Sequence, residues 1–203
     1  MNFICESNTL DDYLAETEEI DYSDPSIQEK AVELYSISLT EMDFIRNTFE
    51  FVRDRISHSW DIQSSRVTCK ASEVIFFQEG ICYAKSNLLA ALLRSKGIPA
   101  GFCYQRLTLG DTPETGYCIH ALNALYIKSI DRWVRLDARG NKNGVDAQFS
   151  VDREKLAFPV RDYYGEIDYP VIYAKPNAET IAVLKGSDDC KQMYLHGLPA
   201  DLI

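Results

Sequence analysis

Three side chains that can act together on a carbonyl group stand at Cys82, His120 and Asp137. A thiolate attacks carbonyl carbon, an imidazole moves protons near neutral pH, and a carboxylate can orient that imidazole and stabilise its cationic form. Each residue alone also has an ordinary structural interpretation, since free cysteines are often buried as small hydrophobes. The chemistry therefore depends on whether the fold brings the three together.

Cys82 opens the stretch with the clearest helical pattern. Gly80 precedes it, and Gly97 and Pro99 end the stretch. One apolar face is formed by Leu88, Leu89, Leu92 and Leu93. This spacing predicts a helix with Cys82 in its first turn, where unpaired N–H groups and the positive end of the helix dipole favour an anion. Because the thiolate is the nucleophilic form of cysteine, the position favours reactivity.

His120 and Asp137 lie on two predicted strands that a short turn connects. The strands span residues 117–127 and 132–138. If the chain turns between Lys128 and Ser129, His120 lies directly opposite Asp137, and directly opposed side chains point to the same face. A slip of one residue would separate the pair. The pattern predicts that the carboxylate orients the imidazole.

Size and charge limit the classes of function. The chain has 203 residues, of which 46% are hydrophobic, and a formal net charge of −10. This length fits one domain, and no apolar run approaches the roughly 20 residues that a membrane helix requires. The acidic balance argues against binding to a phosphate backbone, which requires clustered Lys and Arg. We expect neither a membrane nor a nucleic-acid partner.

The cysteines and histidines show no metal-binding spacing. The six cysteines are scattered and form no C-x-x-C pair, and the chain has three histidines. Zinc sites need closely spaced pairs of such ligands, so we expect no metal. The first ten residues lack the basic and apolar regions of a secretory signal. We therefore expect a cytoplasmic protein with reduced thiols.

The remaining elements predict one domain over residues 1–203. It comprises an acidic, extended surface arm and a helix (1–39), a catalytic core (40–140) and an irregular covering segment (141–203). Thr40 and Asp43 resemble a capping pair at the start of a helix. The predicted helices span residues 25–37, 41–56, 72–78, 82–96 and 177–185. Further strands are predicted over residues 100–109 and 146–151.

Three motifs in this order resemble the core of the transglutaminase-like superfamily. They are Gly80-Ile81-Cys82 leading into the helix that ends Gly97-Ile98-Pro99-Ala100, then His120-Ala121, then Trp133-Val134-Arg135-Leu136-Asp137. The resemblance covers about residues 40–140. It implies an α+β, papain-like fold in which N-terminal helices, including the nucleophile helix, pack on an antiparallel sheet. It also implies that Cys82, His120 and Asp137 form a catalytic triad.

A tetrahedral intermediate on Cys82 needs hydrogen-bond donors for its oxyanion. The backbone N–H of Cys82 is one candidate, and Gln78 is the candidate side-chain donor. Trp60 is a candidate for covering the cleft. His58 competes with His120 as the base, although no strand geometry pairs His58 with a carboxylate.

The sequence predicts a cysteine enzyme that acts on an amide or acyl carbonyl through a thioester, without a cofactor. Peptides, proteins or small amides are the expected substrates, and hydrolysis, deamidation and amine transfer all remain open. The alternative is a non-catalytic transglutaminase-like module that uses its cleft to bind proteins, because a fold does not fix a reaction. The sequence does not predict an oligomeric state.

Overall fold

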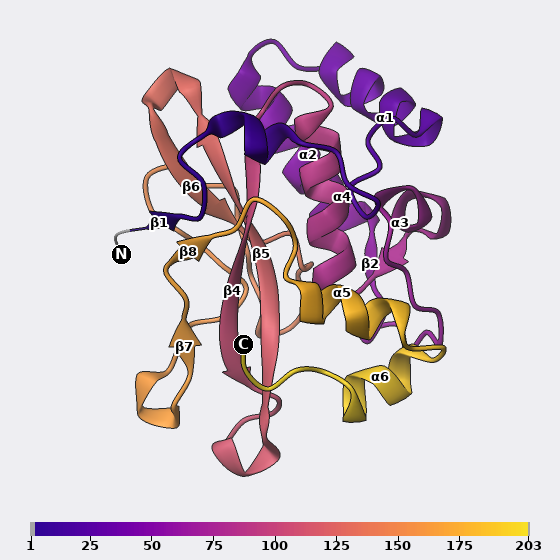
Figure 1. Ribbon diagram of the computed structural model, residues 1–203, viewed down its shortest axis with the longest axis vertical. Coiled ribbons are helices and arrows are strands. Elements are labelled where there is room, and N and C mark those ends of the chain that lie inside the picture. The colour runs from indigo at the N-terminus through magenta and orange to yellow at the C-terminus, as the bar shows by residue number, and fades with distance from the viewer. Residues whose placement is uncertain (1–2, 203) are drawn as a thin grey trace.

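The computed structural model describes residues 3–202 and places helices on one side of a four-stranded antiparallel sheet (Figure 1). The strand order in this sheet is β6-β5-β4-β7. Its strands are β4 (Ala100–Thr108), β5 (Tyr117–Ile127), β6 (Arg132–Leu136) and β7 (Ile167–Asp168). The helices are α1 (Pro25–Ser36), α2 (Glu41–Arg55), α3 (Ala71–Phe77), α4 (Cys82–Arg94), α5 (Ala178–Lys185) and α6 (Cys190–His196). The mixed α+β architecture confirms the predicted fold class.

Two short parallel pairs complete the sheet structure. The first joins β1 (Ile4–Cys5) to β8 (Val171–Ile172). The second joins β2 (Ser57–His58) to β3 (Glu79–Gly80), directly before α4. The second pair fixes the residues around His58 beside the chain that leads into Cys82.

Side chains that satisfy free N–H groups define the starts of the helices. Asp24 accepts a hydrogen bond from the N–H of Ser26 at the start of α1. Thr40 accepts from the N–H of Asp43 at 3.1 Å, as the sequence pattern predicts. Such caps stabilise a helix by about 1 kcal/mol each. They set where α1 and α2 begin, whereas α4 begins without a side-chain cap.

Helix α4 is the centre of the main core. From Tyr83 to Arg94 each of its residues is buried, and its leucines pack with the apolar faces of α1, α2 and the sheet. The buried face includes Leu88, Leu89, Leu92 and Leu93, which are all inaccessible to solvent. Burying such side chains contributes about 1.5–3 kcal/mol each. This anchoring holds the N-terminus of α4, and hence Cys82, in a fixed place.

The N-terminal arm differs from the extended surface segment that the sequence predicts. Its acidic residues are mostly on the outside, but Tyr13 and Ile20 are completely buried. Tyr13 belongs to a second apolar cluster with Cys103 and Leu122 of the sheet. Its hydroxyl donates to the carbonyl oxygen of Ile172 at 3.1 Å. The arm is held because a few apolar side chains outweigh its polar composition.

The hairpin between β5 and β6 turns later than the sequence predicts. Asn123 lies opposite Leu136, and Ile127 lies opposite Arg132. The connection contains a 3-10 turn followed by Asp131 in the left-handed conformation, with φ of 52°. The register is therefore displaced by two residues from the prediction. An even displacement preserves the face of every side chain.

The C-terminal segment also differs from the prediction in two places. No strand forms over residues 146–151 in the described chain, and this segment is irregular. The sequence pattern does not predict helix α6, because its seven residues are too few to show a clear apolar period. Helix α5 matches the prediction, with Asn177 as its cap. In the described residues, no helix is long and apolar enough to cross a membrane.

Arg94 links the end of α4 to three other segments of the chain, and its replacement tests that link. Its buried guanidinium donates to the carbonyl oxygens of Ala15, Ala100 and Ala174 at 2.5–3.0 Å. Burial lowers its pKa to about 10. Arg94→Met leaves three carbonyl groups without this donor, so we expect a loss of about 3 kcal/mol in the free energy of unfolding, measured with urea. Lys96→Met is the control, and equal losses in both variants contradict the prediction.

Candidate active site

His120 and Asp137 form a buried pair at the edge of the hairpin. His120 Nε2 lies 2.8 Å from Asp137 Oδ2, and the two side chains are 5% and 0% exposed. Because the register is displaced by two residues, Asp137 lies diagonally across from His120 instead of directly opposite. The preserved face lets the two side chains meet. The sequence therefore identifies the contact, although it places the turn wrongly.

Backbone N–H groups hold the carboxylate of Asp137 in position. Arg139 N donates to Oδ1 at 3.1 Å, and Ala157 N donates to Oδ2 at 3.0 Å. Burial alone raises the pKa of Asp137. The positive charge and hydrogen bond of His120, with the two N–H donors, outweigh burial and hold that pKa below its usual value. Asp137 is thus a fixed, ionised partner for the imidazole.

His120 connects this carboxylate to Cys82. Nε2 of the ring faces Asp137, and Cys82 lies close enough to contribute to the raised pKa of the ring. Burial lowers the pKa of His120, but the charges of Asp137 and Cys82 outweigh it and raise the pKa to about 10. The edge of Phe158 packs against the ring, with centroids 5.2 Å apart. The imidazole is therefore held between an acceptor and a thiol and is stabilised as a cation.

A cavity of about 560 Å³ contains Cys82 and His120 in its wall. Cys82 is partly exposed and is the first residue of α4. Trp60 and Tyr194 of α6 also line the cavity, and their rings stack with centroids 4.2 Å apart. The volume falls within the range of sites for small molecules or short peptide segments.

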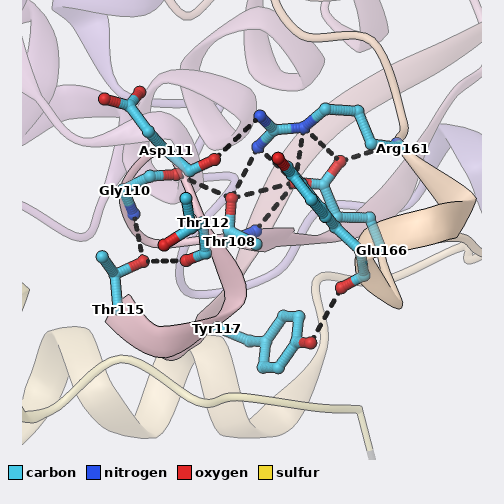
Figure 2. Close-up of polar contacts among 9 residues, drawn as sticks. Thr108, Gly110, Asp111, Thr112, Thr115, Tyr117, Arg161 and Glu166 are labelled. Carbon is cyan, nitrogen blue, oxygen red and sulfur yellow. Dashed lines mark hydrogen bonds and ion pairs between the residues drawn. The ribbon is translucent and has the colours of Figure 1, made fainter.

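Two groups of ion-paired residues contribute to the wall of this cavity. Asp61, which follows Trp60, accepts hydrogen bonds from the lining residues Arg139 and Lys142. In the second group, Glu166 accepts from Arg161 and from both the N–H and the hydroxyl of Thr108 (Figure 2). These contacts link the segment after Phe158 to the end of β4. They form walls around the thiol.

A family model described as "Transglutaminase-like superfamily" matches residues 17–138. This match covers more than half of the chain and includes Cys82, His120 and Asp137. The chain belongs to the transglutaminase-like superfamily. No curated protein matches it.

Solved structures agree with this membership at the level of the fold. A protein from Cytophaga hutchinsonii that is proposed to be a cysteine protease has a TM-score of 0.51 and 18% identity. The match covers 66% of this chain and 43% of that protein's length. This transglutaminase-like chain therefore spans less than half of that relative.

Two further structures have lower similarity. The periplasmic domain of TgpA from Pseudomonas aeruginosa has a TM-score of 0.46 and 16% identity, and the match covers 62% of this chain and 45% of that one. A structure described as a TGase has a TM-score of 0.46 and 17% identity, with 93% of this chain and 54% of that one covered.

The other predicted site residues of this superfamily member separate into two groups. Trp60 and His58 line the cavity, and His58 is buried. Gln78 does not line it. Gln78 ends α3 in the left-handed conformation, with φ of 56°, and its side chain is exposed. That conformation turns the chain into β3 and leaves Gln78 outside the cavity wall, so Gln78 has no support as an oxyanion donor.

His58 is less suited than His120 to act as a base. Burial is the largest cause that lowers the pKa of His58 well below its usual value, followed by the charge of Arg139. Its Nδ1 is buried and has no hydrogen-bond partner among the described residues. Since no carboxylate of the described chain contacts the ring in a hydrogen bond, His58 lacks the orienting partner that His120 has.

Sequence reasoning missed three residues of the site in this transglutaminase-like fold. Ala157 orients Asp137, Phe158 packs on His120, and Tyr194 stacks on Trp60. They come from irregular chain and from a short helix, where periodicity gives no signal. Within residues 3–202, no group of three or more His, Cys, Asp or Glu side chains could hold a metal ion.

Proposed function

We propose that this superfamily member is a cysteine enzyme that acts on an amide or acyl carbonyl. Cys82 is the nucleophile, His120 is the general acid and base, and Asp137 orients His120. The observation that carries the proposal is the buried 2.8 Å contact between His120 Nε2 and Asp137 Oδ2, made by a ring that shares a cavity wall with Cys82. Nucleophile, base and orienting group in mutual reach are the requirements of thiol acyl transfer.

The first half of the reaction forms a thioester. The Cys82 thiolate attacks the carbonyl carbon, and a new C–S bond gives a tetrahedral intermediate. The C–N bond then breaks, and the imidazolium of His120 gives its proton to the leaving amine. The raised pKa of His120 keeps that proton available at neutral pH.

The second half releases the acyl group. Neutral His120 takes a proton from water or from an acceptor amine, whose oxygen or nitrogen attacks the thioester. The C–S bond breaks, and the thiolate and imidazolium are restored. Attack by water gives hydrolysis, and attack by an amine gives transfer.

The start of α4 supports the oxyanion in this proposal. As the first helical residue, Cys82 has a backbone N–H without an intrahelical acceptor, and such a group can donate to the developing oxyanion. The stacked rings of Trp60 and Tyr194 form an apolar part of the wall of the same cavity. Both features act near the carbonyl that Cys82 attacks.

A peptide-pool experiment tests the proposal. Wild type and Cys82→Ala are incubated with diverse peptides, with and without a primary amine, and the products are identified by mass. We expect cleavage, deamidation or amine incorporation that depends on Cys82. Cys118→Ala is the matched control, because Cys118 lines the same cavity but does not stand at the start of α4.

Two results would contradict an enzymatic function. One is the absence of any Cys82-dependent product in every pool, and the other is equal turnover by wild type and Cys82→Ala. Retention of a peptide from the pool without its conversion would favour the alternative, a non-catalytic binding module.

A further inference from the structure

Two cationic side chains of the cavity wall, Arg139 and Lys142, share a single carboxylate partner. Arg139 forms a two-pronged ion pair with Asp61, with N–O distances of 2.5 and 2.9 Å. Lys142 also contacts Asp61, at 2.6 Å. Arg139 and Lys142 both line the cavity, whereas Asp61 does not. One carboxylate therefore faces two cations, and a unit of positive charge remains.

The part of the wall formed by Arg161 and Glu166 does not share this excess. Arg161 and Glu166 form an ion pair there (Figure 2). The Glu166 side chain is only 1% exposed. Hydrogen bonds from Arg161 and Thr108 hold the pKa of Glu166 down at about 2 against the effect of burial. Asp111 adds a negative charge to this part of the wall, because only its backbone carbonyl contacts Arg161. The cavity wall thus carries excess positive charge at Arg139 and Lys142 and negative charge at Asp111.

The charge of Arg139 helps to lower the pKa values of two buried bases, Lys85 and His58. Burial is the main cause that lowers the pKa of Lys85 to about 7, and the charge of Arg139 is the second. The same two causes act, in the same order, on His58. Arg139 is itself only 4% exposed, so water screens its charge little. The local positive charge is thus opposite in sign to the net charge of the protein, which is −10.

We propose that the part of the cavity wall formed by Arg139 and Lys142 binds an anionic group of the substrate. The substrate is then an amide or acyl donor with a carboxylate or similar anion close to the reacting carbonyl. The negative charge of Asp111 disfavours an anion at that part of the wall. The inference rests on the proposed function, because it assigns specificity to the same cleft.

Lys142 is the residue to vary. Its side chain is 44% exposed, and Asp61 is its ion-pair partner, so its loss leaves the core intact. Lys155 is a matched control: it is 53% exposed, it pairs with Asp146, and it does not line the cavity. Arg139 is less informative, because its burial makes misfolding a competing explanation.

The test compares alkylation of Cys82 by iodoacetate, which is anionic, and by iodoacetamide, which is neutral and similar in size. The measured quantity is the ratio of the iodoacetate rate constant to the iodoacetamide rate constant at Cys82, read by peptide mass near neutral pH. We expect Lys142→Ala to lower this ratio about fivefold, and Lys142→Glu to lower it further. Lys155→Ala should retain the wild-type ratio, and added salt should lower the ratio in wild type.

The outcomes separate the two proposals. An unchanged ratio in both Lys142 variants, with a reactive Cys82, overturns the anionic subsite and leaves the enzymatic function standing. An equal fall in Lys155→Ala also overturns it, since the effect would then follow overall charge. A Cys82 that reacts with iodoacetamide no faster than an ordinary thiol contradicts the proposed function itself, whatever the ratio.

Discussion

His120→Ala should lower the alkylation of Cys82 by iodoacetamide about tenfold at pH 6. An ordinary thiol is almost entirely protonated at that pH, so its reaction is slow and rises about tenfold with each pH unit. In wild type, His120 holds a proton through neutral pH because its pKa is raised to about 10. Its positive charge beside the thiol favours the reactive thiolate, so the wild-type rate should exceed that of the variant.

The shape of the pH profile is the decisive measurement for this prediction. A more stable thiolate is also a weaker nucleophile, so the gain in rate is smaller than the gain in thiolate. The variant should therefore approach or exceed the wild-type rate above about pH 9. Cys118 supplies an internal reference in each sample, since burial raises its pKa to about 12. Superimposable wild-type and variant profiles would refute the thiolate–imidazolium pair.

Asp137→Asn is expected to reduce turnover of a peptide-pool substrate by about 10²–10⁴-fold, as loss of the orienting carboxylate does in related chemistry. The side chain keeps its size but loses its charge. Asp137 raises the pKa of His120, so its neutralisation moves that pKa from about 10 towards 6.5. In the variant the imidazolium therefore loses its proton at lower pH, and the alkaline limb of the rate profile moves to lower pH.

Two measurements distinguish this effect from a folding defect. Thermal unfolding of Asp137→Asn reports whether the new amide side chain still accepts the N–H groups of Arg139 and Ala157, which contact the native carboxylate at 3.0–3.1 Å. The pH profile of turnover reports the charge. Asp146→Asn removes an exposed carboxylate and serves as the control, which should keep its alkaline limb. An alkaline limb that does not move in Asp137→Asn excludes the proposed role of Asp137.

Regular elements with strong periodic patterns could be predicted from the sequence. The predicted strand over residues 117–127 coincides with β5, and the helix that starts at Cys82 coincides with α4. Both lie in the core, where alternation or helical spacing of apolar residues determines the structure. The capped start of α2 at Thr40 is also predictable, because its signal is local.

Other features depend on contacts between distant residues. The true hairpin register follows from the left-handed Asp131, and no local pattern marks that residue for a longer turn. The contacts of Ala157 with Asp137 and of Phe158 with His120 join distant parts of the chain. The assignment of Gln78 fails because its nearness to Cys82 along the chain hides the turn that exposes it. The contact of His120 with Asp137 can be predicted only because the predicted register is wrong by two residues. An even displacement leaves both side chains on the same face of the hairpin.

The wall formed by Phe158, Arg161 and Tyr194 determines when the site is completed during synthesis. A chain leaves the ribosome from its N-terminus, so Cys82, His120 and Asp137 emerge before this wall. Until then the thiol has no aromatic cover from Tyr194, and Asp137 lacks the N–H of Ala157. If Cys82 is the nucleophile that we propose, we therefore expect its full reactivity only after the C-terminal segment has been made.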